Sequence, residues 1–217
     1  MSNKCKICGF ETRKIHSKQF NADYHYCERC EFISKDENAI ISPEDELTIY
    51  NDHNNSIDDP RYVAYFYKFL EAAVFNYVNE GKKGLDFGSG PSPVLAQILE
   101  KNHGYAVDIY DLYYSPEKVY LNKKYDLVTS TEVVEHLKDP LEYFSLFKGL
   151  LCDTGVLAVM TLFHQNDEQH FLRWHYMRDK SHISFYTTKT MEYIADLVGL
   201  KVIHTNGIRY TTFAVRQ

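Results

Sequence analysis

The chain has 217 residues, 44% of them hydrophobic, and carries a formal net charge of −6 at neutral pH. This length accommodates one complete α/β domain together with a small additional module. The negative charge argues against long nucleic acids as partners, because these require a broad basic surface. The sequence contains neither an apolar run long enough for a membrane span nor an apolar signal segment at its start, so we expect a cytoplasmic protein. It carries no signal for an oligomeric state.

Four of the five cysteines open the chain as two Cys-x-x-Cys pairs, Cys5 with Cys8 and Cys27 with Cys30. This spacing is typical of a two-knuckle zinc site, in which four thiolates complete a tetrahedral shell. A closed shell leaves no position for substrate, so we expect structural Zn²⁺ in a zinc ribbon over residues 1–36. The alternatives are reduced pairs without metal, or disulfides in a secreted protein.

Residues 37–59 are polar and rich in turn-forming residues, which predicts a linker or lid. A helical turn is expected after Ser42, where Asp45 would complete a capping interaction. His53 and Asn54 add hydrogen-bonding side chains that would contact substrate if this segment closed over a pocket. The alternative is an exposed turn.

The larger domain is predicted to begin at Pro60, which starts a helix to about Asn79 capped by Asp58 or Asp59. A short apolar run then ends at Asp86 and is followed by a Gly-x-Gly turn at 88–90 and an apolar helical pattern. This order is typical of the first strand–turn–helix unit of a nucleotide-binding α/β sheet. The next apolar run ends at Asp111, where an acid can accept hydrogen bonds from both hydroxyls of a ribose.

The ligand is indicated by Pro93, which stands where a dinucleotide fingerprint needs a small residue. Asp86 would repel a pyrophosphate but would attract an ammonium group. S-adenosylmethionine has a ribose and an amino acid end and carries no phosphate, so it fits both acids. The cofactor-binding candidates are therefore Asp86, Gly88, Ser89, Gly90 and Asp111. An NAD(P)-binding oxidoreductase is the alternative, and it would need the turn that Pro93 interrupts.

The rest of the chain continues the α/β alternation. Helices are expected from Pro140 to Leu150 and, capped by Thr188, to Leu197; strands are expected at Val119–Leu121, Tyr125–Ser130, Val156–Thr161, Leu200–His204 and Ile208–Val215. The last two strands surround Asn206-Gly207, which predicts an antiparallel pair.

From residue 60 to 217, this set of motifs resembles class I S-adenosylmethionine-dependent methyltransferases, with the glycine motif present as Gly88-x-Gly90-x-Ser92. The resemblance implies a Rossmann-like, seven-stranded methyltransferase sheet, mostly parallel and ending in an antiparallel hairpin. It also implies that the loop from Asp86 to Gly90 holds the methionine end and that Asp111 holds the ribose. Ser130, Thr131 and Glu132 would then line the adenine and sulfonium side.

Within this class, Glu132-x-x-Glu135-His136-Leu-x-Asp-Pro and the later His182-x-x-Phe-Tyr-Thr are similar to the ubiquinone-biosynthesis O-methyltransferase branch. The cysteine-rich start resembles bacterial methyltransferases of poorly defined substrate and some sugar methyltransferases. Methyl transfer to a small molecule is the function that these resemblances imply. A non-catalytic zinc-ribbon interaction protein that retains the fold is a further alternative.

Glu132, Glu135 and His136 follow a predicted strand at spacings that place them on one face of a helical turn. Together with His182 they would form a divalent-metal site that acidifies an acceptor hydroxyl. The set looks like the metal site of small-RNA 2′-O-methyltransferases. Alternatively, the two acids favour a helix N-terminus and His136 serves as a base without metal.

Trp174, His175 and Tyr176 provide a stacking surface, a base and a hydroxyl in the loop after a predicted strand. Because ligands bind at the carboxyl ends of strands in open α/β sheets, we expect these residues to contact an aromatic or sugar-like hydroxyl acceptor. His175 joins Glu135, His136 and His182 as a catalytic candidate. The alternative for Trp174 is core packing.

Overall fold

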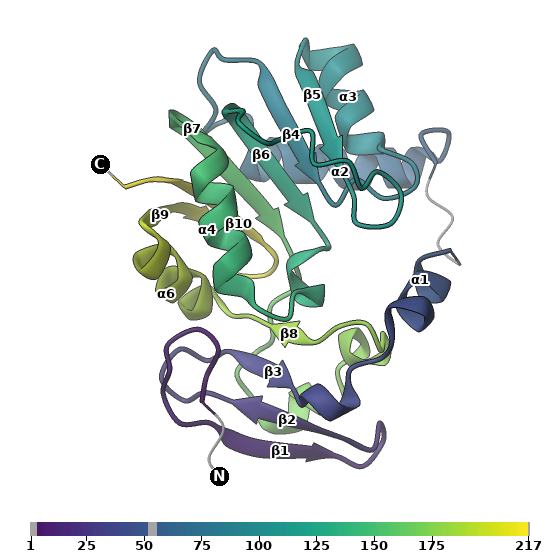
Figure 1. Ribbon diagram of the computed structural model, residues 1–217, viewed down its shortest axis with the longest axis vertical. Helices are drawn as coiled ribbons and strands as arrows, with labels where there is room; N and C mark the ends of the chain where they lie inside the picture. Colours follow the sequence, from purple (N-terminus) through teal and green to yellow (C-terminus); the bar gives the residue numbers. More distant parts are fainter. Residues whose placement is uncertain (1–3, 52–55, 217) are drawn as a thin grey trace.

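The computed structural model describes residues 4–51 and 56–216, which form two sheets with helices packed around them (Figure 1). The larger sheet has the order β5-β4-β6-β7-β10-β9, and the smaller has the order β1-β2-β3-β8. The strands of the two sheets are β1 (Arg13–Ser17), β2 (Ala22–Tyr26), β3 (Ile33–Lys35), β4 (Lys83–Phe87), β5 (Ala106–Tyr110), β6 (Tyr125–Thr131), β7 (Leu151–Met160), β8 (Ser184–Phe185), β9 (Leu200–Thr205) and β10 (Tyr210–Val215).

The helices are η1 (Glu37–Ala39), α1 (Pro43–Asn51), α2 (Pro60–Ala73), α3 (Val94–His103), η2 (Val134–His136), α4 (Pro140–Leu150), α5 (Glu168–Phe171), η3 (His175–Arg178) and α6 (Thr188–Val198). Across residues 4–51 and 56–216, none of them is both long and apolar enough to cross a membrane.

The larger sheet is mixed, as expected, but it has six strands and not seven. β5, β4, β6 and β7 pair in parallel, while β10 runs antiparallel between β7 and β9. The predicted strand Val119–Leu121 forms turns instead. Its apolar run is only three residues long, Tyr120 turns inward to pack on Phe87, and Asn122 adopts a left-handed φ of 61°. The chain therefore reverses before it can join the sheet.

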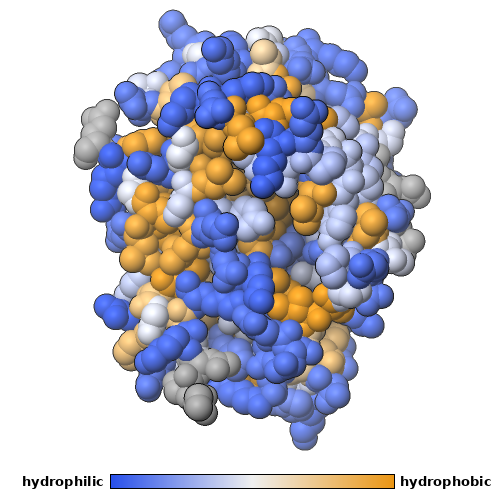
Figure 2. Space-filling view, in the orientation of Figure 1, coloured by the Kyte–Doolittle hydropathy of each residue, from blue (hydrophilic) through white to orange (hydrophobic). Residues whose placement is uncertain are grey.

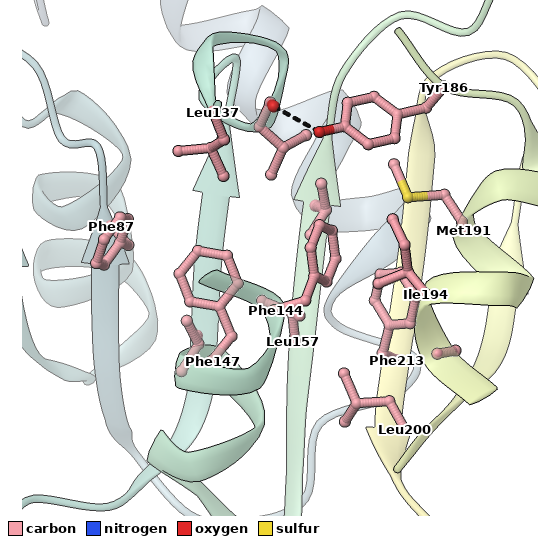
Figure 3. Close-up of a cluster of buried hydrophobic side chains, with 14 of the residues drawn as sticks. Phe87, Leu137, Phe144, Phe147, Leu157, Tyr186, Met191, Ile194, Leu200 and Phe213 are labelled. Carbon is pink, nitrogen blue, oxygen red and sulfur yellow. Dashed lines mark hydrogen bonds between the residues drawn. The ribbon is translucent and has the colours of Figure 1, made fainter. Parts of the chain in front are cut away.

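The helices cover both faces of the larger sheet because successive side chains of its central strands point to opposite faces, and the side chains on both faces are mostly apolar. In β7, Leu157 and Val159 belong to the core beneath α4 and α6, whereas Val156, Ala158 and Met160 belong to the core beneath α2 and α3. Figure 3 shows the first of these cores, where aromatic and aliphatic side chains from α4, α6, β7 and β10 meet. On the face shown in Figure 2, apolar side chains gather toward the left, over α4 and α6.

Two predicted helix boundaries differ from the structure: the end of α2 by several residues and the cap of α6 by one residue. α2 begins as expected, with the Asp59 side chain accepting from the Arg61 amide and Pro60 in the first turn, but it ends at Ala73. Val74 leaves helical geometry and its neighbours continue as turns, so the helix does not reach Asn79. The cap of α6 is Thr187, one residue before the expected Thr188, and it forms a capping box with Thr190.

The smaller sheet contains the N-terminal strands and one strand from much later in the chain. β1, β2 and β3 form the predicted N-terminal unit, and β8 extends it through the pairs Ile33–Phe185 and Ser34–Ser184. Residues 163–187 lie between the two sheets and reach down to the N-terminal strands (Figure 1). The N-terminal unit therefore shares a sheet with a segment that sequence analysis assigned to the methyltransferase domain.

Helix α1 occupies the segment predicted as linker or lid. The expected turn after Ser42 is a nine-residue helix, and the Ser42 hydroxyl accepts from the Asp45 amide at 3.2 Å. None of the residues in α1 is buried, so the helix is not anchored in a core. His53 and Asn54, the predicted substrate contacts of this segment, lie outside the described residues.

Candidate active site

A cavity of about 980 Å³ lies at the carboxyl ends of β4, β5 and β6, and α1 and α2 also contribute to its wall. Open α/β sheets bind their ligands at this edge. Of the predicted residues, Asp86, Gly88, Ser89, Gly90, Asp111, Thr131, Glu132, His136 and His182 line the cavity. The structure thus brings the glycine loop and the histidines to one cavity.

Glycine is favoured at the two loop positions for different structural reasons. Gly88 has a φ of +86°, and a Cβ there would lie 2.1 Å from a methyl carbon of Val133, so only glycine fits. Gly90 has a φ of +66°, and a Cβ there would meet no atom within 4 Å. Because Gly90 lines the cavity, its backbone is open to a ligand. Val133 follows β6, so the first glycine also lets the two strand ends approach each other.

Asp86 is the more deeply buried of the two acids that the sequence predicts to bind a cofactor. Its side chain is 2% exposed, and the Thr129 hydroxyl donates to it at 2.8 Å. Burial raises the pKa of Asp86 to about 7, against the hydrogen bond from Thr129, which lowers it. A carboxyl group with this pKa is stabilised in its ionised form by a cationic ligand.

Asp111 links the glycine loop to the segment that follows β5. One carboxylate oxygen accepts from the Gly90 amide at 2.9 Å, and the other accepts from the amides of Tyr113 and Tyr114. The Tyr113 hydroxyl donates to Glu46 at 2.5 Å, and the Tyr114 hydroxyl donates to Asn51 at 2.8 Å. The segment after Asp111 therefore connects the glycine loop to α1.

Glu132 lies directly after β6 and has a left-handed φ of 52°, a strained conformation for this residue. Its carboxylate accepts from the hydroxyls of Tyr65 at 2.7 Å and Tyr176 at 2.9 Å. The Tyr176 hydroxyl also contacts Glu135. The Tyr176 hydroxyl has one proton and can donate to only one of the two carboxyl groups. The second contact therefore needs a proton on the other carboxyl group, which then donates to the Tyr176 oxygen. Burial raises the pKa of Glu135 well above its ordinary value, and the charge of Glu132 adds to the shift.

His136 and His182 lie beside each other, with ring centroids 4.8 Å apart. Nδ1 of His136 is 3.2 Å from the Ser181 carbonyl, and Nδ1 of His182 is 2.8 Å from the Tyr176 carbonyl. A carbonyl only accepts, so each Nδ1 carries a proton, and the lone pair of a neutral ring is then on Nε2. Burial lowers the pKa of His182, which favours its neutral form.

Glu135, His136 and His182 each offer a ligand atom, and these atoms lie within 4.8 Å of one another. Oε2 of Glu135 is buried and has no hydrogen-bond partner within the described part of the chain. Glu132 does not belong to this cluster, because Tyr65 and Tyr176 hold its carboxylate elsewhere. The cluster thus contains three of the four ligands that the sequence predicts.

Trp174, His175 and Ser130 do not lie on the cavity wall. Trp174 is 7% exposed and packs among Phe171, Phe185 and other residues of the core beneath the smaller sheet. His175 is exposed at the start of η3 and does not line the cavity. Ser130 is fully buried within β6. Tyr176 does not line the cavity either, but its hydroxyl bonds to Glu132 and Glu135 and its ring packs on His182, with centroids 4.1 Å apart. The stacking surface predicted for an acceptor is therefore a packing surface.

The four N-terminal cysteines form a compact cluster, with all four sulfur atoms within 4.8 Å of one another. Sγ of Cys5 is 3.5 Å from Sγ of Cys30, and Sγ of Cys8 is 3.4 Å from Sγ of Cys27. Disulfide sulfurs lie about 2 Å apart, while thiolates on one zinc ion at about 2.3 Å are separated by roughly 3.8 Å. The cluster thus has the dimensions of a four-thiolate metal site.

Many side chains of the cavity were not predicted as site residues, including four that come from α1 and α2. Glu46 and Tyr50 reach it from α1, Tyr62 and Tyr65 from α2. Tyr50 contacts the His136 ring edge-on, with centroids 5.4 Å apart. The tyrosines of α2 follow a helical spacing that indicates core packing, and α1 has no strong apolar face, so neither helix carried a local signal of a site.

Residues 60–205, more than half of the chain, match the family described as "Methyltransferase domain". The chain belongs to this methyltransferase family, a family of enzymes. No curated protein matched it. Among solved structures, an O-methyltransferase family protein from Burkholderia thailandensis has a TM-score of 0.55 and 13% identity, covering 79% of this chain and 63% of that one.

A second structural match is the mitomycin 7-O-methyltransferase MmcR, with a TM-score of 0.51 and 11% identity. It covers 78% of this chain and 60% of that chain. The chain therefore spans about three fifths of the length of either protein. At these identities the matches show the shared α/β fold.

Proposed function

We propose that this protein transfers a methyl group from S-adenosylmethionine to a hydroxyl group of a small polar molecule. The observation that carries the proposal is one cavity lined by a glycine loop, two acids and a pair of histidines whose Nδ1 atoms face backbone carbonyls. The family match supports methyl transfer over hydride transfer by an NAD(P)-dependent oxidoreductase. Both structural matches quoted above are O-methyltransferases by name.

The cofactor side has the groups that S-adenosylmethionine needs. In this proposal Asp86 pairs with the ligand's ammonium group, the open backbone at Gly90 lies against the methionine end, and Asp111 accepts from the ribose hydroxyls. Thr131, at the end of β6, lies toward the sulfonium. The cofactor supplies an activated methyl group, and the surrounding side chains align the acceptor and exclude water.

The charge of the cavity limits the acceptor. Its wall includes two basic residues, Arg61 and Lys138, and eight acids: Glu46, Asp59, Asp86, Asp111, Glu132, Asp139, Glu142 and Asp179. A phosphorylated or carboxylated acceptor would be repelled unless a metal ion compensated it. We therefore propose a neutral acceptor, consistent with the aromatic or sugar-like hydroxyl expected from the sequence and with the ubiquinone-type motif at 132–140.

Glu135, His136 and His182 fit a divalent metal ion. Neutral imidazoles whose second nitrogen donates to a backbone carbonyl are the usual form of metal-ligating histidines. The unpartnered oxygen of Glu135 adds an anionic ligand once its proton leaves. A bound ion would acidify the acceptor hydroxyl. In this proposal the acceptor enters between α1 and the side of α2 that carries Tyr62 and Tyr65. Without metal, the Nε2 lone pair of His136 would serve as the base.

The cysteine cluster fits a structural zinc ion in the same proposal. The turns after both Cys-x-x-Cys pairs are alike, since the amides of Gly9 and Glu31 donate to the carbonyls of Cys5 and Cys27. Both turn residues have a left-handed φ. Four thiolates leave no open position, so zinc would support folding and take no part in methyl transfer. Reduced thiolates also favour the cytoplasm as the location.

Calorimetric titration with S-adenosylhomocysteine, and separately with NADH and NADPH, tests the proposal. We expect one S-adenosylhomocysteine site per chain and no heat with either dinucleotide. Binding of a dinucleotide instead would favour the oxidoreductase, and no binding of any of the three would favour the non-catalytic interaction protein.

A further inference from the structure

The segment that carries Asp179 and His182 lies between the N-terminal cysteine-bearing unit and the cavity. Residues 4–35, which we call the ribbon, contact this segment on one side, and the residues around η2 contact it on the other. The ribbon supplies no residue to the cavity wall among the described residues. Its relation to the site is therefore indirect and depends on how firmly it holds residues 171–190.

Backbone and side-chain hydrogen bonds tie the ribbon to this segment. The Lys35 amide donates to the Ile183 carbonyl at 2.8 Å, and Lys35 Nζ donates to the Lys180 carbonyl at 2.8 Å. The Thr190 hydroxyl donates to the carbonyl of Cys30, a member of the cysteine cluster, at 2.8 Å. These contacts bracket His182, and together with the β3–β8 pairing they leave it little freedom relative to the ribbon.

Apolar packing adds to these bonds. Ile15, Tyr24 and Ile33 of the ribbon form one core with Phe171, Trp174, Met177 and Phe185 of the later segment. Ile33 is 2% exposed and lies opposite Phe185 in the sheet. Without the ribbon, the later segment would expose these apolar side chains to water, so it has no independent core.

On its other side the same segment sets the geometry of the candidate active site. The Ile183 amide donates to the Glu135 carbonyl at 2.8 Å, and the Ser184 hydroxyl donates to the Leu137 carbonyl at 2.6 Å. The carbonyls of Tyr176 and Ser181 fix the Nδ1 protons of His182 and His136. Nε2 of His182 also lies 3.7 Å from Asp179, which lines the cavity.

We infer that the ribbon is a positioning device for the acceptor side of the active site, in which Ile33 and Lys35 hold His182 and Asp179 in place. The ribbon is thus part of the catalytic unit and not a separate docking module. This inference rests on the proposed function for its metal-binding consequence, but its structural part stands on the contacts alone. Second-sphere changes at metal sites typically weaken metal affinity 10–100-fold.

The test compares full-length Ile33→Ala with full-length Ile98→Ala. Both isoleucines are 2% exposed, but Ile98 lies on α3 in the core between α2, α3 and the larger sheet, whereas Ile33 lies in the smaller sheet. Mn²⁺ is titrated into each protein with detection by electron paramagnetic resonance, amide hydrogen exchange is followed over residues 176–184, and S-adenosylhomocysteine affinity is measured by calorimetry. Zinc content is measured in all samples to show that the cysteine cluster is equally loaded.

We expect Ile33→Ala to weaken Mn²⁺ binding 10–100-fold and to accelerate exchange over 176–184, with S-adenosylhomocysteine affinity unchanged within about twofold. Ile98→Ala should change neither Mn²⁺ affinity nor this exchange. Lys35→Met provides a second variant: loss of its positive charge alone would strengthen Mn²⁺ binding, whereas loss of positioning weakens it.

Unchanged Mn²⁺ affinity in both ribbon variants overturns the inference, even if exchange becomes faster, because the contacts would then be merely structural. If the wild-type protein binds no Mn²⁺, the proposed metal site fails, and the exchange over 176–184 alone decides whether the ribbon holds the segment. Equal exchange in Ile33→Ala and the wild type would then refute it.

Discussion

Replacing Asp86 by asparagine tests the chemistry of the cofactor side through its pH dependence. The pKa of Asp86 is raised by burial to about 7, from an ordinary value of 3.8. Only the ionised carboxylate attracts the ammonium group of the ligand, so affinity should rise with pH until Asp86 is fully ionised. The amino group of the ligand stays protonated between pH 5 and pH 7.

The magnitude follows from the ionised fraction of Asp86. With a pKa of about 7, this fraction falls from about one half at pH 7 to about one hundredth at pH 5. If neutral Asp86 binds as weakly as Asp86→Asn, the affinity of the wild-type protein for S-adenosylhomocysteine should therefore fall about 10–30-fold over this range. Asp86→Asn should abolish this dependence and bind about 10–100-fold more weakly at pH 7, from the loss of a charged hydrogen bond.

Calorimetric titrations at pH 5, 6 and 7 measure this dependence, with Asp108→Asn as the matched control. Asp108 is an acid on β5 bonded to Lys123 and Tyr125, away from the cavity wall, so its variant should keep the pH slope. A raised native pKa also means that ionised Asp86 destabilises the unliganded fold above neutrality, so Asp86→Asn should melt higher than the wild type at pH 8. A pH slope that survives in Asp86→Asn would refute the assignment.

Three further outcomes are expected. Asp111→Ala should weaken S-adenosylhomocysteine binding by about 1–3 kcal/mol through lost charge-assisted hydrogen bonds, and unchanged affinity in calorimetry would remove it from the site. Elemental analysis should find one zinc per chain, lost in Cys8→Ser, and a zinc-free wild type purified without chelator would contradict the ribbon assignment. His136→Ala should lose Mn²⁺ binding while keeping S-adenosylhomocysteine affinity; Mn²⁺ binding equal to that of the wild type would place any ion elsewhere.

The meeting of the candidate cofactor-binding residues at one cavity could be predicted from sequence because its signals are local. The glycine turn, the acid before it and the acid about twenty residues later lie at the ends of two successive strands, and parallel strands bring such ends to one edge. The same logic predicted the approach of His136 and His182. Two residues differ: Glu132 does not join the Glu135–His136–His182 cluster, because two tyrosines from other elements hold its carboxylate, and Ser130 is buried within β6.

The acceptor side could be predicted only in part, because it depends on long-range contacts. β8 has two residues and is stabilised by a strand 150 residues earlier in the chain, which no local pattern indicates. Its pairing turns Trp174 toward the ribbon and away from the cavity. The place of Glu46 and Tyr50 depends on the hydroxyls of Tyr113 and Tyr114, so a helix without an apolar face nevertheless contributes to the site.

A crystal structure with S-adenosylhomocysteine bound tests the central claim most directly. We predict that the ligand lies in the cavity at the ends of β4, β5 and β6, with its ammonium group at Asp86, its ribose hydroxyls at Asp111 and its sulfur facing His136. A ligand that occupied another surface, or that lay in this cavity with its sulfur turned away from the histidines, would contradict methyl transfer at this site.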